Sequence, residues 1–126
     1  MEAASEYDLA VWEGPYPTSD AEAGQTFEML YERYTAGDDS TAPTERIAAY
    51  VSALLARYPD LTELDDDSVD DSPWADGPLI GNARGPFIYF SFVANDAASE
   101  AWELAVSTAR DHGLIAFDPQ TEALAK

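Results

Sequence analysis

Acidic side chains are most densely grouped in residues 60–76, where eight carboxylates could in principle ligate a divalent cation. A calcium loop of the EF-hand type needs oxygen ligands at positions 1, 3 and 5, a glycine at 6 and a glutamate at 12. Counted from Asp65, these positions include Val69, Asp70 and Asp76, so the pattern fails. The sequence therefore predicts no metal and no other cofactor, and it predicts that 60–76 is a self-repelling acidic loop on the surface.

Residues that could support catalysis are sparse elsewhere. His112 is the sole histidine, and its place at the end of an expected helix suits capping and the helix dipole better than catalysis. No Gly-x-Ser-x-Gly segment provides a positioned nucleophile, and no glycine-rich phosphate loop is present. The chain has no cysteine, which excludes disulfides and thiol chemistry. We find no catalytic constellation and expect a protein that is not an enzyme.

Two carboxylates differ from the rest because they belong to or border predicted strands. Asp8 lies in the first expected strand, and Asp118 follows the last one before a proline. Together with Arg84 they could line a pocket between a sheet and its helices. A small-molecule-binding domain or small enzyme with such a pocket is therefore an alternative hypothesis.

The charge balance is the most informative property of the composition. There are 25 Asp and Glu against 6 Lys and Arg, a formal net charge of −19. Such a protein repels nucleic acid and anionic membranes and attracts cationic proteins. Adaptation to salt or a biased genome composition would explain the same charge, and that alternative stays open.

The charge and the missing catalytic residues together favour a protein-binding role with a basic partner. Trp74 lies beside the acidic loop and, with Trp12 and Tyr16, falls outside the clear apolar faces, so we expect exposed anchors there. A DNA mimic and a homodimer formed through an open sheet face are further possibilities. The predicted partner-binding residues are Asp65, Asp66, Asp67, Asp70, Asp71, Trp74 and Asp76.

Length and composition predict one α+β domain over residues 1–126. With 46% hydrophobic residues, the chain can bury a core without a disulfide or a metal. A secretory signal begins with basic residues, and the N-terminal residues carry none before the first apolar run. No apolar run is long enough to cross a bilayer. We therefore expect a cytoplasmic protein.

The hydrophobic periodicity predicts the order strand, helix, helix, strand, strand, helix, strand. Ser19 and Glu22 form a capping-box pattern, and Pro43 is expected in the first turn of the second helix. The boundaries are a half-buried strand over 7–12, helices over 20–37 and 43–58, strands over 79–83 and 87–93 joined around 84–86, a helix capped by Asn95 or Asp96 and ended by Gly113, and a strand over 114–117.

This order is typical of a ferredoxin-like split βαβ sandwich. The first two helices would form one crossover, and the sheet would have four strands, antiparallel or mixed. All helices would cover one face of the sheet, which would leave the other face as a contact surface.

The two ends of the chain resemble a known group of proteins. The segments YDLAVWEG at 7–14 and ARDHGLIAFDPQ at 109–120 are similar to those of small uncharacterised bacterial proteins of similar length. Some similar small acidic α+β domains are immunity proteins for secreted bacterial toxins. The resemblance implies an immunity protein as one form of the protein-binding role and assigns no functional residue.

Overall fold

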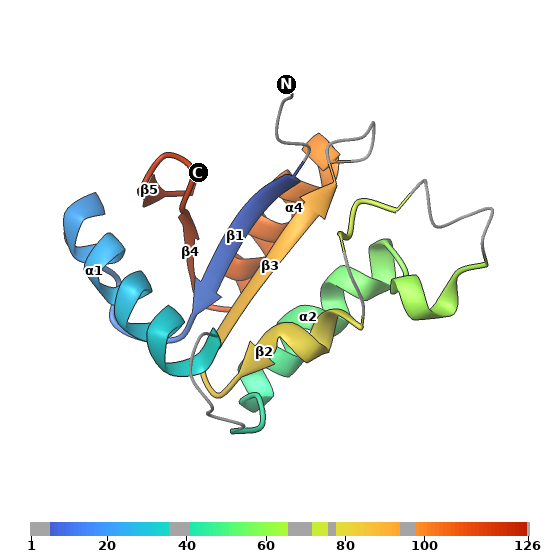
Figure 1. The fold of residues 1–126 in the computed structure, drawn as a ribbon, viewed down its shortest axis with the longest axis horizontal. Coiled ribbons are helices and arrows are strands. Elements are labelled where there is room, and N and C mark those ends of the chain that lie inside the picture. Colours follow the sequence, from blue (N-terminus) through green and yellow to red (C-terminus); the bar gives the residue numbers. More distant parts are fainter. Residues whose placement is uncertain (1–5, 36–40, 66–71, 76–77, 94–97, 126) are drawn as a thin grey trace.

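The sheet is five-stranded and antiparallel throughout the part of the chain that the computed structural model describes, residues 6–35, 41–65, 72–75, 78–93 and 98–125 (Figure 1). Its strand order is β2-β3-β1-β4-β5. The α+β class is confirmed, and the four-stranded sheet is corrected to five. The elements are β1 (Glu6–Trp12), α1 (Asp20–Leu30), α2 (Glu45–Arg57), β2 (Ala83–Arg84), β3 (Phe87–Val93), α4 (Ala98–Asp111), β4 (Ile115–Asp118) and β5 (Ala123–Leu124).

Helix α1 begins where the capping box predicts. The Ser19 hydroxyl accepts a hydrogen bond from the Glu22 amide at 3.1 Å, and the Glu22 carboxylate accepts one from the Thr18 amide at 3.0 Å. The α-helical part ends at Leu30 and continues as one π-helical turn, Tyr31–Thr35. The predicted end at Gly37 lies outside the described residues.

Helix α2 begins two residues later than predicted. Thr44 is its N-cap, because the Thr44 hydroxyl accepts a hydrogen bond from the Ile47 amide at 3.3 Å. Pro43 therefore precedes the cap and does not belong to the first turn. The helix ends at Arg57, just before Pro59, as expected.

The hairpin before β3 is shorter than the sequence predicts. Residues Leu79–Asn82 form a 3₁₀ helix, so only Ala83–Arg84 remain as a strand. The turn needs glycine at Gly85, which has a φ of +53° and whose added Cβ would lie 3.1 Å from the Tyr34 ring. Residues 73–75 pair with the other end of β3, through Val93 N to Pro73 O at 2.8 Å and Ala75 N to Ser91 O at 3.0 Å.

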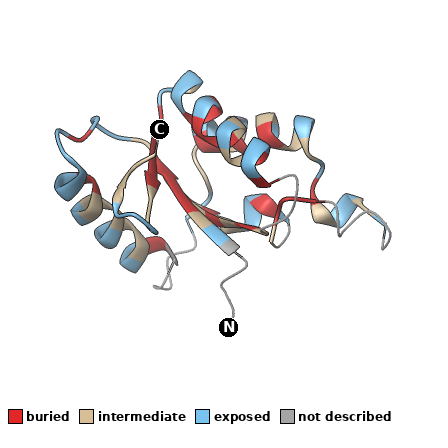
Figure 2. Ribbon diagram, turned by 90° about the horizontal axis from the view of Figure 1, so that it is seen from above, coloured by how far each residue is buried: buried red, intermediate tan, exposed pale blue. Residues whose placement is uncertain are grey.

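Helices cover both faces of the sheet, so the expectation of one covered face is wrong (Figure 2). Leu9 and Val11 of β1 pack against α2 and α4, whereas Ala10 and Trp12 pack on the opposite side, where α1 lies. The expected half-buried strand is buried on both sides from Leu9 to Trp12. The physical reason is that both alternating sets of β1 side chains are apolar, and each set needs a cover.

The segment 60–76, predicted as an acidic surface loop, is partly built into the fold. Asp60 is only 4% exposed. Its carboxylate accepts hydrogen bonds from the Leu79 amide at 3.0 Å and the Thr62 amide at 3.3 Å, and it caps the 3₁₀ helix Leu61–Glu63. Asp60 is therefore a structural residue, because a buried carboxylate requires such donors.

Candidate functional site

Trp74 is a core residue, which corrects its assignment as an exposed anchor. It is 1% exposed, and its indole Nε1 donates to the Tyr58 carbonyl at 2.9 Å. Its ring lies 6.0 Å from that of Tyr58 and 5.6 Å from that of Phe92. An aromatic residue buried in its own core cannot also fill a pocket on a partner.

The other predicted anchors and acids are placed as follows. Trp12 is 1% exposed and is also a core residue, whereas Tyr16 is 68% exposed. Asp65 is exposed just after the 3₁₀ helix that Asp60 caps. The remaining predicted partner-binding residues, Asp66, Asp67, Asp70, Asp71 and Asp76, lie outside the described residues.

Asp8 and Asp118 are brought together by a residue that the sequence did not indicate, Gln120. The Gln120 amide group donates to the Asp8 carbonyl at 2.9 Å and accepts from the Asp8 amide at 2.6 Å. It also donates to Asp118 Oδ1 at 2.5 Å. Gln120 thus binds the start of β1 much as a neighbouring strand would, and it fixes the turn after β4 against β1.

Arg84 and His112 do not join these carboxylates. Arg84 pairs with Phe87 at the far end of β3 from Ser91, the residue opposite Asp8, and Arg84 donates to the Gly81 carbonyl at 2.8 Å. His112 Nδ1 lies 2.9 Å from the Thr108 carbonyl at the end of α4. His112 therefore helps to cap this helix.

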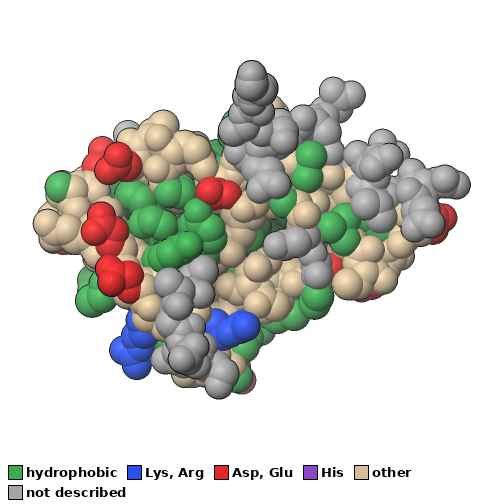
Figure 3. Space-filling model, in the orientation of Figure 1, with side chains coloured by type: hydrophobic (Ala, Val, Ile, Leu, Met, Phe, Trp, Pro, Cys, Tyr) green, Lys and Arg blue, Asp and Glu red, His purple; other side chains and the backbone are tan. Residues whose placement is uncertain are grey.

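Hydrophobic side chains gather where α1 lies beside the sheet, with acidic side chains around them (Figure 3). We name this cleft, which is about 350 Å³ in volume, the α1 cleft. None of its described lining residues is basic, and its two glutamates are exposed. The lining residues are Phe27, Glu28, Tyr31, Glu32, Tyr89 and Pro119.

Three aromatic rings form the wall of the α1 cleft. The ring of Tyr31 meets that of Tyr89 edge to face at 5.1 Å, and Phe27 lies within 5.8 Å of both. Phe27 also stacks on Phe117 of β4 at 5.2 Å, which attaches the cluster to the sheet. The π-helical turn begins at Tyr31, and such turns occur frequently at functional sites.

The Asp8 carboxylate lies beneath this wall and is held by hydroxyl groups. It accepts hydrogen bonds from the Tyr89 hydroxyl at 2.8 Å and from Ser91 Oγ at 2.5 Å. Burial and then the bond to the Asp8 carboxylate raise the pKa of Tyr89. Tyr89 is thus a fixed hydrogen-bond donor at neutral pH, and it does not serve as a base.

Alkaline pH is expected to weaken the fold through Tyr50 and Tyr89. Burial raises the pKa of Tyr50, whose hydroxyl donates to the Ala105 carbonyl at 2.9 Å. The folded protein keeps protons that an unfolded chain loses near pH ~10, so the free energy of unfolding falls as pH rises above about 10. Urea unfolding from about pH 9 to about pH 11 should show a smaller fall in a Tyr50→Phe/Tyr89→Phe variant. Equal falls in both proteins would contradict this assignment.

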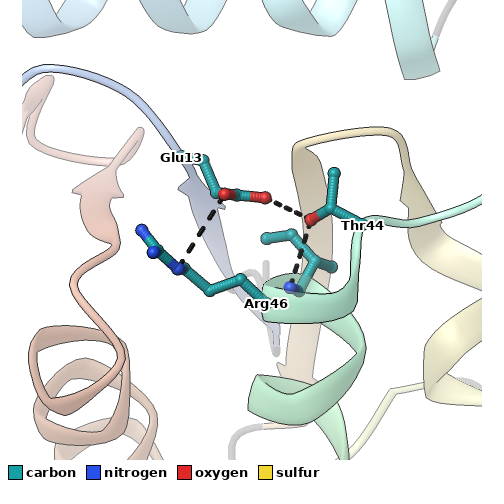
Figure 4. A network of polar contacts seen from close by, with 4 residues as sticks. Glu13, Thr44 and Arg46 are labelled. Carbon is teal, nitrogen blue, oxygen red and sulfur yellow. Dashed lines mark hydrogen bonds and ion pairs between the residues drawn. The ribbon is translucent and has the colours of Figure 1, made fainter.

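A second polar network, formed by Glu13, Thr44 and Arg46, has a structural role (Figure 4). The Thr44 hydroxyl donates to Glu13 Oε2, and Arg46 Nε lies 3.9 Å from Glu13 Oε1. The Glu13 amide in turn donates to the Pro86 carbonyl at 2.9 Å. These contacts join the end of β1, the β2–β3 turn and the start of α2, and Arg46 is too exposed for its ion pair to be strong.

Neither a metal cluster nor a membrane-spanning helix occurs in the described part of the chain. Its residues contain no group of three or more His, Cys, Asp or Glu side chains placed to hold a metal ion. Among its helices, none has the length and apolar character needed to cross a membrane.

The α1 cleft was missed because Phe27 and Tyr31 share the apolar spacing of the helix expected over 20–37, which is typical of core residues. One signal was present in the strand FIYFSFV. Residues 87, 89 and 91 are Phe, Tyr and Ser, so this face carries hydroxyl groups, whereas residues 88, 90 and 92 are wholly apolar. Because successive side chains of a strand point to opposite faces, the hydroxyl groups of Tyr89 and Ser91 indicate that their face is open to polar contacts at the end that carries them. Gln120 gave no comparable signal.

Comparison of the chain with protein-family models, curated proteins and solved structures gives no match in any of the three. Functional inference therefore rests on the side chains of this chain.

Proposed function

We propose that this protein binds a basic protein partner and that the α1 cleft is the centre of the contact. The observation that carries the proposal is an aromatic cleft whose described charged lining residues, Glu28 and Glu32, are both acidic. A Lys or Arg side chain can lay its apolar stem on Tyr31 and Tyr89 and bring its charged end to these carboxylates. The net charge of −19 adds long-range attraction to such a partner.

The arrangement of side chains agrees with what is known of binding energetics. Aromatic residues at the centre of a contact usually contribute most of the affinity, and rim charges mainly accelerate the encounter. Met29, which is 62% exposed, adjoins Glu28 and Glu32 in a neighbouring hollow that Arg33 also lines. The proposal therefore predicts an affinity that depends on the rings and an association rate that falls with salt.

In this proposal the acidic loop contributes electrostatic attraction to the basic partner, but no aromatic contact residue, because Trp74 is buried. Asp65 is exposed, and Asp66, Asp67, Asp70, Asp71 and Asp76 follow it in the sequence. An inhibitor or immunity protein of a cationic toxin is one specific form of this function. The aromatic cleft favours a protein contact over a DNA mimic, because a mimic needs a path of negative charges and gains nothing from exposed rings.

For the fold, we propose a split βαβ core of ferredoxin-like type with α1 and β5 as additions. Two observations support it: neighbouring strands in the order β2-β3-β1-β4 are all antiparallel, and α2 and α4 pack on the same face. In that arrangement α2 connects β1 to β2, and α4 connects β3 to β4.

Charge reversal at the α1 cleft tests the function. Peptides selected from a random displayed library on the wild-type protein are expected to be rich in Lys and Arg. Their affinity should fall about tenfold or more in a Glu28→Lys/Glu32→Lys variant, because two attractive charges become repulsive. The fold should tolerate this change, since α1 has no basic residue in its last turn and lysine suits a helix C-terminus.

The matched control is Glu45→Lys/Asp111→Lys, which makes the same change of net charge at exposed positions of α2 and α4. If control and cleft variants lose affinity equally, binding follows net charge alone and the cleft assignment is wrong. Changing Asp65, Asp66, Asp67, Asp70 and Asp71 to Asn tests the loop, and unchanged association kinetics would remove it from the proposal.

A further inference from the structure

A second cleft lies on the opposite face of the sheet from the α1 cleft. It is formed where the start of β1, the first turns of α4 and the turn after β4 meet, and its volume of about 450 Å³ is in the range of ligand pockets. We name it the Trp102 cleft. Its aromatic and polar lining includes Tyr7, Trp102, Glu103, Asp118, Gln120 and Thr121.

Aromatic rings provide the apolar part of the Trp102 cleft. Tyr7 is 47% exposed, an unusual exposure for a tyrosine in a central strand. Trp102 is partly exposed, and its ring is supported by that of Phe92 at 5.5 Å. Tryptophan has the aromatic face that attracts cations most strongly.

Two carboxylates provide the charge. Asp118 Oδ1 is fixed by the backbone amide of Gln120 at 2.9 Å and by the Gln120 side chain at 2.5 Å. No hydrogen bond from a described residue reaches Asp118 Oδ2, and Glu103 has no ion-pair partner among the described residues. Gln120 is itself held by Asp8, so the Asp118 carboxylate is positioned before any ligand arrives.

The beginning of α4 opposes these charges, but more weakly. Ala98 and Ser99 line the cleft, and the start of a helix carries roughly half a positive charge. Two carboxylates exceed that amount, and none of the described lining residues is basic. The potential in the cleft is therefore negative, which excludes phosphates and carboxylates as ligands.

We propose that the Trp102 cleft binds a small organic cation with an ammonium or guanidinium head group. The head group lies against Trp102 and is neutralised by Asp118 and Glu103. The apolar part of the ligand contacts Tyr7, which lines the same cleft. This site is separate from the protein contact at the α1 cleft and does not depend on it.

Tryptophan fluorescence tests the proposal directly. The chain has 3 Trp, of which Trp12 and Trp74 are each 1% exposed, so a bound ligand is reported by Trp102. Choline and ethylguanidinium are titrated against their neutral isosteres, 3,3-dimethylbutanol and ethylurea. The cations are expected to give a saturable change with an affinity at least about tenfold above that of the isosteres.

Variants distinguish a specific site from general attraction to an acidic protein. Asp118→Asn should weaken cation binding about fivefold or more, and Trp102→Phe should remove the fluorescence change. Glu45→Gln, an exposed acid elsewhere, should have no effect. Equal binding of cations and isosteres, no saturable change with either cation, or equal losses in Asp118→Asn and Glu45→Gln would overturn the proposal.

Discussion

Replacing Trp74 with alanine is expected to lower the free energy of unfolding by about 3–5 kcal/mol, a loss typical of the largest aromatic residues in a core. The substitution removes a ring that is 1% exposed and contacts Tyr58, Phe90 and Phe92. It also leaves the Tyr58 carbonyl without the indole donor that lies 2.9 Å away. A loss of this size would leave a protein of ordinary stability close to unfolding.

Urea unfolding of three variants checks this expectation. Trp74→Phe keeps a ring but loses the hydrogen bond, so its loss should be smaller than that of Trp74→Ala. Tyr16→Ala removes an aromatic residue that is 68% exposed and should change the free energy of unfolding by less than about 0.5 kcal/mol. If Trp74→Ala lowers the free energy of unfolding no more than Tyr16→Ala does, Trp74 is not a buried core residue.

The sequence predicted the elements whose apolar spacing is regular. The start of α1 at Asp20 follows from Ser19 and Glu22, and the limits of β3 follow from an apolar run that only Ser91 interrupts. The α+β class and the antiparallel pairing of β1 with β3 are in line with that pattern. These features depend on local capping and periodicity, which a single sequence contains.

Features that depend on tertiary packing could not be predicted in the same way. Alternation in β1 does not show that both of its faces find a cover, so α1 was placed on the wrong side of the sheet. Trp74 was judged by its acidic neighbours in the sequence, although its environment is set by Phe92, with which it forms a bridge between strands.

The same limit applies to the candidate site. Asp8 and Asp118 were singled out because each lies in or beside a strand, and the structure does bring them to one place. Their connection through Gln120 spans 112 residues, and no spacing rule reaches that far. The aromatic wall was missed because Phe27, Tyr31 and Tyr89 have the spacing of core residues, and only three-dimensional packing shows that they are partly exposed.

Replacing Tyr31 with alanine is expected to have the largest effect on partner binding. Its ring packs against those of Phe27 and Tyr89 in the wall of the α1 cleft and is partly exposed. A central aromatic residue of this kind typically contributes about 2–4 kcal/mol, which corresponds to an affinity loss of roughly 30-fold to 1,000-fold. Phe27 still stacks on Phe117 in the variant, so α1 should stay attached to the sheet.

The dissociation constant of the selected basic peptide, measured by calorimetry for wild type, Tyr31→Ala and Tyr16→Ala, tests the central claim most directly. Circular dichroism and urea unfolding of each variant confirm that the compared proteins are folded. If the peptide binds in the α1 cleft, its affinity should fall at least about 30-fold in Tyr31→Ala and less than about twofold in Tyr16→Ala. Equal affinities of wild type and Tyr31→Ala, with both proteins folded, would contradict the assignment of the α1 cleft as the binding site.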